Sequence, residues 1–319
     1  MFALKKCVAI LDRLNMGKSM AITQKIKFFL ISLSMAFSGV CAFAQEPLPR
    51  LLPDDLFRRN IGSEGQLDTQ FPPHKIIDNI YYVGTESLGS FLITTDQGHI
   101  LVNSDFERTV PTIKDSVEQL GFAFEDIEII IGSHEHGDHM EGDALAKELS
   151  GAQVIAVAEQ VPGLAHMRPG GKPHPIDQVI IDGEQISLGN EVLTAHLTPG
   201  HSNGCTSWEL TVSEGGRDYQ VVIICSVGVN PYYQLWNNPE RPNIVALYES
   251  SYAKLRGLDV DIPLGSHPSM YKLAEKYPLI GQGKNPFIDP EGYFYEIDIN
   301  EQAMRLRLEE QRLAAKQAQ

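Results

Sequence analysis

Positive charge is scarce in this sequence. Its 319 residues include 26 Lys and Arg against 41 Asp and Glu, a formal net charge of −15. Residues 1–44, interpreted below as a leader, hold six basic residues and one acidic residue, so removing them moves the formal charge from −15 to −20. A body this acidic repels phosphate backbones, which argues against a nucleic-acid substrate or partner. We expect a small-molecule substrate.

Cysteine is also scarce. The chain has four, and only Cys205 and Cys225 lie beyond the leader. An exported protein occupies a compartment in which disulfides persist, so these two residues are a candidate disulfide. The alternative is two buried free thiols, which are common in protein cores. The separation of the two Cα atoms decides between them, and the sequence leaves both open.

The N-terminus carries a long uncharged apolar run, residues 28–44. Two lysines precede it, and Ala-Phe-Ala at 42–44 offers small residues for cleavage, as in a secretory signal peptide. We therefore predict a leader over residues 1–44, cleaved near Ala44/Gln45, and a periplasmic or secreted protein without stable membrane association. An uncleaved membrane anchor and a lipid-modified Cys41 are the alternatives. Translation could start at Met1 or at Met20.

Beyond the leader, residues 45–71 are Pro-rich and without periodicity, which predicts an extended N-terminal arm. From residue 72 to 319, short apolar runs bounded by Gly, Asp and Asn alternate with helical spacings, which predicts a single α/β domain. Residues 163–177, rich in Gly, Pro and His, predict either a loop over the functional site or an ordinary surface loop. The predicted strands are 76–83, 90–94, 99–102, 127–131, 153–157, 179–181, 192–197, 206–212, 219–225 and 261–264, and the predicted helices are 109–120, 143–149, 243–255 and 300–315.

The most informative segment is residues 133–139, Ser-His-Glu-His-Gly-Asp-His, which follows the predicted strand 127–131. In an extended chain alternate side chains share one face, so His134 and His136 can address one metal ion. A turn at Gly137 lets Asp138 and His139 address a second ion. Zinc prefers imidazole and carboxylate ligands, and a catalytic zinc takes three protein ligands and leaves a position for water. Each ion therefore needs one more ligand.

Two further histidines, each in a loop next to a glycine, can supply the one additional ligand that each ion needs. His201, in T-P-G-H-S, follows the predicted strand 192–197, and His267, in G-S-H-P, follows the apolar residues 262–264. We predict that these two complete the ligand sets. The other histidines are interpreted as ordinary surface or core residues: His74, His99, His166, His174 and His196.

Four segments carry a resemblance to a known family: HEHGDH at 134–139, TPGHSNGCTSW at 198–208, ICS at 224–226 and GSHP at 265–268. Their order and spacing resemble the metallo-β-lactamases of class B, subclass 3. The resemblance implies an α/β fold, a four-layer αβ/βα sandwich with the metals in a cleft at one edge. It also implies two zinc ions per chain, the first held by His134, His136 and His201 and the second by Asp138, His139 and His267.

One strand end distinguishes among members of that superfamily. Lactonases, glyoxalase-like thioesterases and nucleases share the H-x-H-x-D-H run and typically place a bridging aspartate at a strand end between the last two histidines. Here the strand ends in Ile224-Cys225-Ser226, without an aspartate. Other β-lactamase subclasses place a metal-binding cysteine about where Ser226 falls and lack the histidine at 139. Ser226 together with His139 therefore resembles subclass 3.

The resemblance implies hydrolysis of the β-lactam amide bond, the reaction of antibiotic resistance. Zinc lowers the pKa of bound water to about 7, so a hydroxide shared by two ions can be the nucleophile. We expect Asp138 to bind zinc and to accept a hydrogen bond from this hydroxide. Ser226 is expected to contact a zinc-bound water or the substrate, or else to be an ordinary buried serine. Tyr232 and Tyr233 are candidate substrate-binding residues, with ordinary packing as the alternative.

Gly228 departs from the pattern of the family, in which many members carry Ser or Thr that helps to bind the substrate carboxylate. The departure leaves the predicted metal site intact. It motivates a second hypothesis, a zinc hydrolase of lactones or of other esters and amides. A non-catalytic metal-binding protein is a third hypothesis, and the complete ligand set argues against it.

Overall fold

The computed structural model describes residues 47–318, and the chain from Leu48 to Gln319 forms one compact unit. The predicted leader and its cleavage site at Ala44/Gln45 lie outside the described residues. Within the described residues, no helix has the length and apolar character needed to cross a bilayer. From Leu48 on, the segment predicted as an arm belongs to the same unit as the rest of the chain.

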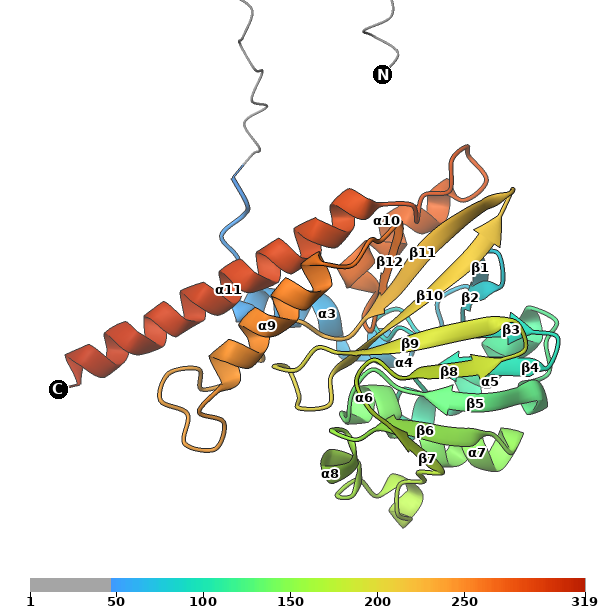
Figure 1. The fold of residues 1–319 in the computed structure, drawn as a ribbon, viewed down its shortest axis with the longest axis horizontal. Coiled ribbons are helices and arrows are strands. Elements are labelled where there is room, and N and C mark those ends of the chain that lie inside the picture. The colour runs from blue at the N-terminus through green and yellow to red at the C-terminus, as the bar shows by residue number, and fades with distance from the viewer. Residues whose placement is uncertain (1–46, 319) are drawn as a thin grey trace, which may run out of the picture. The chain divides into compact units, whose positions relative to one another are not determined.

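The first sheet has seven strands that lie side by side in sequence order (Figure 1). They are β1 (His74–Ile77), β2 (Ile80–Tyr82), β3 (Phe91–Thr95), β4 (Gly98–Val102), β5 (Ile127–Ile131), β6 (Gln153–Val157) and β7 (Gln178–Ile180). Strands β1 to β4 pair antiparallel, and β4 to β7 pair parallel. In β5, Ile129 and Ile131 belong to the core between the sheets, whereas Ile130 packs in a separate cluster with Ile113 and Val117. A continuous apolar run is typical of such a strand, covered on both faces.

The second sheet has five strands in the order β12-β11-β10-β9-β8. They are β8 (Gln185–Leu188), β9 (Glu191–Leu197), β10 (Thr206–Glu214), β11 (Arg217–Ile224) and β12 (Ile262–Gly265). Neighbours pair antiparallel except β11 and β12, which are parallel and so end at the same edge. Trp208 of β10 is buried and donates a hydrogen bond of 3.1 Å from its indole nitrogen to the Gly132 carbonyl beyond β5. This bond ties the second sheet to the loop that carries the histidine cluster.

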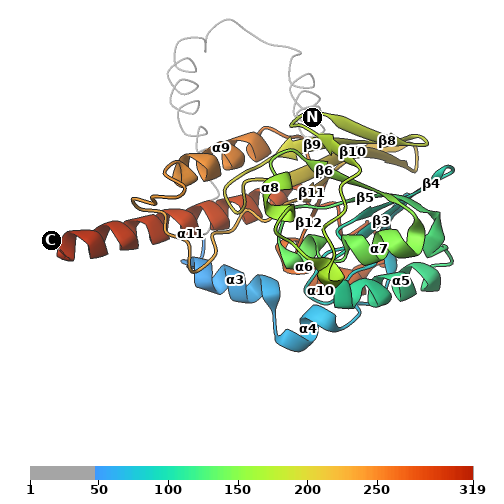
Figure 2. The same ribbon diagram turned by 90° about the horizontal axis from the view of Figure 1, so that it is seen from below.

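Helices cover the outer faces of both sheets (Figures 1 and 2). Helix α5 (Val110–Gln119) and helix α7 (Asp143–Ser150) pack on the first sheet, and helices α9 (Ile244–Arg256) and α11 (Pro290–Gln317) pack on the second. The Tyr293 hydroxyl of α11 donates to the Leu255 carbonyl of α9. The predicted four-layer α/β sandwich is confirmed.

The prediction of an extended N-terminal arm over residues 45–71 was wrong. This segment contains helix α3 (Pro53–Ile61) and helix α4 (Glu64–Asp68). Pro53 lies in the first turn of α3, acidic residues follow it and Arg59 lies in the last turn, so local signals for a helix were present. Apolar periodicity was weak because α3 buries little more than Leu56, which packs against Ile299 and Ala303 of α11.

Strand β8 was not predicted, and among the boundaries that differ from prediction two differ most. Residues predicted as one strand, 76–83, form the hairpin β1–β2, and Asp78 at its turn adopts a φ of 44°. The C-terminal helix begins at Pro290 instead of residue 300, with the Asp289 side chain accepting a hydrogen bond from the Gly292 N–H. The remaining short helices are α6 (Gly137–Met140), α8 (Val161–Leu164) and α10 (Leu273–Lys276), and the 3-10 turns are Glu107–Thr109, Phe124–Asp126, Pro169–Gly171, Pro268–Tyr271 and Tyr277–Leu279.

Candidate metal centre

The six predicted ligands leave the ends of three strands at one edge of the sandwich. His134 and His136 follow β5, and Asp138 and His139 lie in α6, the short helix that comes next. His201 follows β9, and His267 follows β12. Ser226 follows β11, the parallel neighbour of β12, so it emerges beside His267. Carboxyl ends of parallel strands meet at one edge of a sheet, which is where open α/β sheets place their sites.

Three histidines form the first group. His134 Nε2 lies 2.9 Å from His136 Nδ1, and His201 Nε2 lies 3.2 Å from the same His136 nitrogen. All three donor atoms lie within 4.8 Å of one another. Two imidazole nitrogens bound to one tetrahedral zinc at 2.0 to 2.1 Å stand about 3.3 Å apart. The spacing of the group fits one zinc ion.

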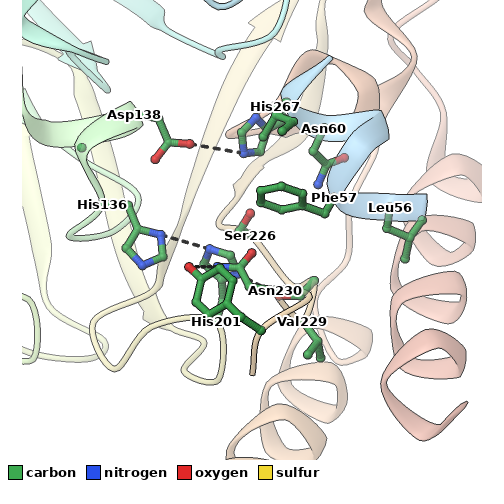
Figure 3. Close-up of a pocket in the computed structure, with 14 residues that line it drawn as sticks. Leu56, Phe57, Asn60, His136, Asp138, His201, Ser226, Val229, Asn230 and His267 are labelled. Atoms are coloured by element: carbon green, nitrogen blue, oxygen red, sulfur yellow. Dashed lines mark hydrogen bonds and ion pairs between the residues drawn. The ribbon is translucent and has the colours of Figure 1, made fainter. Parts of the chain in front are cut away.

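Asp138, His139 and His267 form the second group. Asp138 Oδ2 lies 3.2 Å from His139 Nε2 and 3.9 Å from His267 Nε2. Figure 3 shows Asp138 and His267 facing each other across the pocket, with His136 and His201 facing each other below them. A carboxylate and two imidazoles are a second zinc-type donor set, adjacent to the first.

The far ring nitrogens of two of these histidines are anchored to backbone carbonyls. His201 Nδ1 lies 2.8 Å from the Gly228 oxygen, and His267 Nδ1 lies 2.9 Å from the Ser87 oxygen. A carbonyl can only accept, so each Nδ1 carries the proton and each Nε2 presents its lone pair to the centre. Metal-binding histidines are oriented in this way.

His139 provides an independent test of the fit to a metal. Its ring is completely buried, and within residues 47–318 neither ring nitrogen makes a well-aligned hydrogen bond, although Nε2 lies 3.2 Å from the Asp138 carboxylate. Buried polar atoms without partners are rare because leaving them unpaired is unfavourable. An ion bound at Nε2 would satisfy one of them. The residues present therefore fit a metal at this group.

Burial and neighbouring charges keep most of these donors in the form that binds a metal. Burial lowers the pKa of His201 to about 3 and of His267 to about 4, and it also lowers the pKa of His134 and His136. At neutral pH these four imidazoles are therefore uncharged, and each has a ring-nitrogen lone pair available for a metal ion. Burial opposes the charged form of His139 as well, but Asp138 raises its pKa above the ordinary value.

Both donor groups contribute residues to the lining of a cleft of about 280 Å³, His136 and His201 from the first and Asp138 and His267 from the second. One wall comes from helix α3, in the segment predicted as an extended arm. Residues 163–177, predicted as a possible cover, do not line the cleft, and His174 in that stretch binds the Met140 carbonyl at 2.9 Å instead. The lining residues are Leu56, Phe57, Asn60, Ile61, His136, Gly137, Asp138, His201, Ser226, Gly228, Val229, Asn230, Tyr232 and His267.

Of the candidate substrate-binding residues, Ser226 and Tyr232 line the cleft and Tyr233 does not. Ser226 is nearly buried beside the centre, and Tyr232 is 75% exposed at the rim. The Tyr233 hydroxyl donates a hydrogen bond of 2.6 Å to the His201 carbonyl, so in this structure it supports the His201 loop.

The family model of the metallo-beta-lactamase superfamily matches residues 47–213, which is more than half of the chain. This chain belongs to the metallo-β-lactamase superfamily. The FEZ-1 metallo-beta-lactamase from Legionella gormanii is 41% identical, with a TM-score of 0.73 over 77% of this chain and 98% of that one. BJP-1, a subclass B3 metallo-beta-lactamase of Bradyrhizobium japonicum, is 35% identical, with a TM-score of 0.73 over 78% of this chain and 98% of that one. The predicted resemblance to subclass 3 is confirmed.

Curated relatives of another activity also match this superfamily member. Hydroxyacylglutathione hydrolases of Cereibacter sphaeroides and Rhodospirillum rubrum are 35% and 32% identical over 75 and 89 residues. These matches cover 24% and 28% of this chain, and only 26% and 30% of the relatives. Together the comparisons make the chain a hydrolase of the metallo-β-lactamase superfamily and leave its substrate open.

The candidate disulfide is present in this metallo-β-lactamase fold. Cys205 and Cys225 are bonded, with a Cα–Cα separation of 5.7 Å that lies in the range a disulfide requires. Both sulfurs lie close enough to His134 to suggest a further metal group. Sulfurs that are bonded to each other are not thiolates, so they offer no strong metal ligand.

Sequence reasoning missed two groups that shape the site. Asp105 is fully buried behind His139 with a φ of 57°, and burial raises its pKa to about 7. A non-glycine residue in this left-handed region, next to a histidine cluster, was beyond what the sequence pattern could reveal. The second group is helix α3, for which Pro53 and the flanking charges were the available signals.

Proposed function

We propose that this protein is a β-lactamase that holds two zinc ions and hydrolyses the lactam amide bond. The observation that carries the proposal is the pair of adjacent donor groups that face one cleft, His134, His136 and His201 in one and Asp138, His139 and His267 in the other. The absence of a carboxylate at Ser226, where β11 ends, supports a subclass B3 arrangement over that of the thioesterases.

Zinc ions held by these groups would supply a nucleophile from water at neutral pH and polarise the substrate carbonyl. The residues of the chain then orient the reactants. Burial raises the pKa of the Asp138 carboxyl, but His139 and its neighbours outweigh this and hold it below its usual range. Asp138 is therefore ionised, and it can accept a hydrogen bond from the attacking water. The Ser226 hydroxyl can donate to the substrate.

A second candidate function is hydrolysis of thioesters, lactones or other esters on the same scaffold. The matches to hydroxyacylglutathione hydrolases favour it, as does Gly228, which gives the cleft no hydroxyl for a substrate carboxylate. Ser226 at the end of β11 weighs against the thioesterase form of this hypothesis. Both functions use the same donor groups, so metal content alone does not separate them.

Turnover and metal content measured on the same sample test the proposal. Purified protein that begins at Gln45 should contain close to two zinc ions per chain and should open a penicillin, a cephalosporin or a carbapenem. A chelator should abolish turnover, and added zinc should restore it. The matched substrates are an aliphatic lactone and a hydroxyacyl thioester of glutathione. Metal-loaded protein that turns these over and leaves every lactam class intact would establish the second function.

We also propose that the protein is exported, as its N-terminal sequence predicts. Expression of the full chain in a Gram-negative host should yield periplasmic or secreted protein whose mass corresponds to a start at Gln45. Full-length mass together with recovery in the cytoplasm would contradict this.

A further inference from the structure

Asn60 of helix α3 reaches the cleft with its amide held in one orientation. Its Oδ1 accepts hydrogen bonds from Arg59 Nε at 3.1 Å, Arg59 Nη2 at 2.9 Å and Ser269 Oγ at 2.9 Å. A guanidinium group can only donate, so the atom it contacts must be the amide oxygen. The Nδ2 group is therefore turned away from Arg59, and within residues 47–318 it makes no hydrogen bond.

Arg59, which donates to the Asn60 oxygen, is itself held in place by an ion pair. Arg59 makes a two-pronged ion pair with Glu296 of α11, with Nη1–Oε2 at 2.8 Å and Nη2–Oε1 at 2.5 Å. Glu296 is almost completely buried, and Asn300 Nδ2 also donates to its Oε1 at 2.8 Å. Bidentate arginine–carboxylate pairs fix both partners in position. A donor held in this way loses little freedom when it binds a ligand.

The position of Asn60 defines what it can reach. Ser269, which binds its oxygen, lies two residues beyond His267, so Asn60 is attached to the loop of the second donor group. Figure 3 shows Asn60 and Phe57 in the pocket beside His267, on the opposite side from His136. A lactam whose leaving nitrogen faces this second group would bring the adjacent carboxylate within reach of the wall that carries Asn60, since Asn60 and His267 line the same cleft.

We propose that Asn60 Nδ2 binds the carboxylate that stands next to the leaving nitrogen of the substrate. This assignment rests on the proposed function. Gly228 provides no hydroxyl for that carboxylate, and Asn60 supplies an N–H donor from another wall of the cleft. Hydrogen bonds to an ionised acceptor are stronger than neutral ones. Donation from Arg59 to Oδ1 polarises the amide and strengthens its N–H groups as donors.

Replacement by aspartate separates substrate binding from structural support. Asn60→Asp keeps an oxygen for Arg59 and Ser269 but removes the N–H donor and adds a negative charge. For a carboxylate-bearing penicillin we expect KM to rise roughly tenfold or more, with kcat changed much less. For the methyl ester of the same penicillin, KM should match that of the wild type. Asn60→Ala, which removes both the donor and the oxygen, should raise KM for the acid less than aspartate does.

A purely structural Asn60 gives the opposite pattern, and that pattern overturns the assignment. The alanine variant, which adds no charge, would then change KM by the same factor for the acid and for its methyl ester. Asn190→Asp is the matched control, since it makes the same change at an exposed turn between β8 and β9. It should leave both KM values unchanged.

A binding measurement makes the test independent of turnover. Ring-opened penicillin should shift the side-chain amide ¹⁵N resonance of Asn60, and its methyl ester should not. An unmoved resonance, or equal shifts with both probes, overturns the assignment. Wild-type protein that opens no lactam of any class defeats the proposed function itself. Lactam turnover with no distinction between acid and ester in the Asn60 variants defeats only the assignment of Asn60.

Discussion

Replacing Cys205 and Cys225 together by alanine should lower the free energy of unfolding by about 3 kcal/mol. The two residues are 20 positions apart. Closing a loop of this length removes roughly 11 cal/mol/K of entropy from the unfolded chain, which is about 3 kcal/mol at 25 °C. Both side chains are completely buried, so the change also takes two sulfur atoms out of a packed core. Any cavity that the missing sulfur atoms leave lowers the free energy of unfolding further.

Urea unfolding followed by tryptophan fluorescence measures this difference. Trp208 is 1% exposed in the core between the sheets, so its emission reports on global unfolding. For a unit of this size, 3 kcal/mol corresponds to a fall of roughly 6 to 12 °C in Tm. Wild-type protein unfolded in the presence of reductant is the matched control, because it loses the cross-link and keeps the sulfur atoms. Both proteins must be compared at the same zinc content.

The reasoning fails if the double variant and the reduced wild type each lose less than about 1 kcal/mol. That outcome would mean that the cross-link does not restrict the unfolded chain. Zinc content and kcat should stay close to those of the wild type, because the bonded sulfurs are not ligands. A variant that folds normally and loses one zinc ion would refute this part of the prediction.

Three further changes probe the centre and its surroundings. Asp138→Asn should reduce bound zinc from two ions to about one and lower turnover by on the order of 100-fold or more, measured by metal analysis and kinetics. As the pH falls, the second group should release its metal first, because Asp138 raises the pKa of His139 whereas burial lowers the pKa of the first group, with His201 at about 3. Gly228→Ser should be more stable than Gly228→Ala by roughly 1 kcal/mol, because its hydroxyl can donate to the buried Oδ1 of Asn300, which has no hydrogen-bond partner among residues 47–318.

Each of these has a control and a contrary outcome. Asp96→Ala, at an exposed turn remote from the cleft, should keep both zinc ions and full activity. Zinc analysis after dialysis at successive pH values would contradict the pH prediction if both ions left together or the first group emptied first. For Gly228, alanine adds the same Cβ, which would lie 3.0 Å from Asn300 Oδ1, so equal stabilities of the two variants would exclude the hydrogen bond.

Strands and helices with strong periodicity were predictable from the sequence. The helix predicted over 243–255 is α9 (Ile244–Arg256), and the helix predicted over 143–149 is α7 (Asp143–Ser150). Their apolar positions recur at helical spacing because each covers a sheet. Helix α3 was missed because it buries one main apolar side chain, Leu56, and is held by polar contacts that leave no periodic trace.

The sequence by itself determined which six side chains are candidate metal ligands, and their binding of zinc stays a prediction. Side-chain direction alternates along an extended segment, and the choice of imidazole and carboxylate is a matter of local chemistry, so residues 134–139 indicated a paired site without a fold. From the sequence, Cys205 and Cys225 could form a disulfide or remain buried free thiols. Only the Cα separation of 5.7 Å in the folded chain decided between the two.

The surroundings of the donors were decided by the tertiary structure alone. Arg59 and Glu296 meet across 237 positions of sequence, and their pairing brings Asn60 and Phe57 to the cleft. The fold also places the Tyr233 hydroxyl on the His201 carbonyl and leaves residues 163–177 out of the cleft lining. Docking of one helix on another depends on surfaces that only the folded chain assembles. The sequence therefore determined which groups could hold metal, and the fold decided what a substrate meets there.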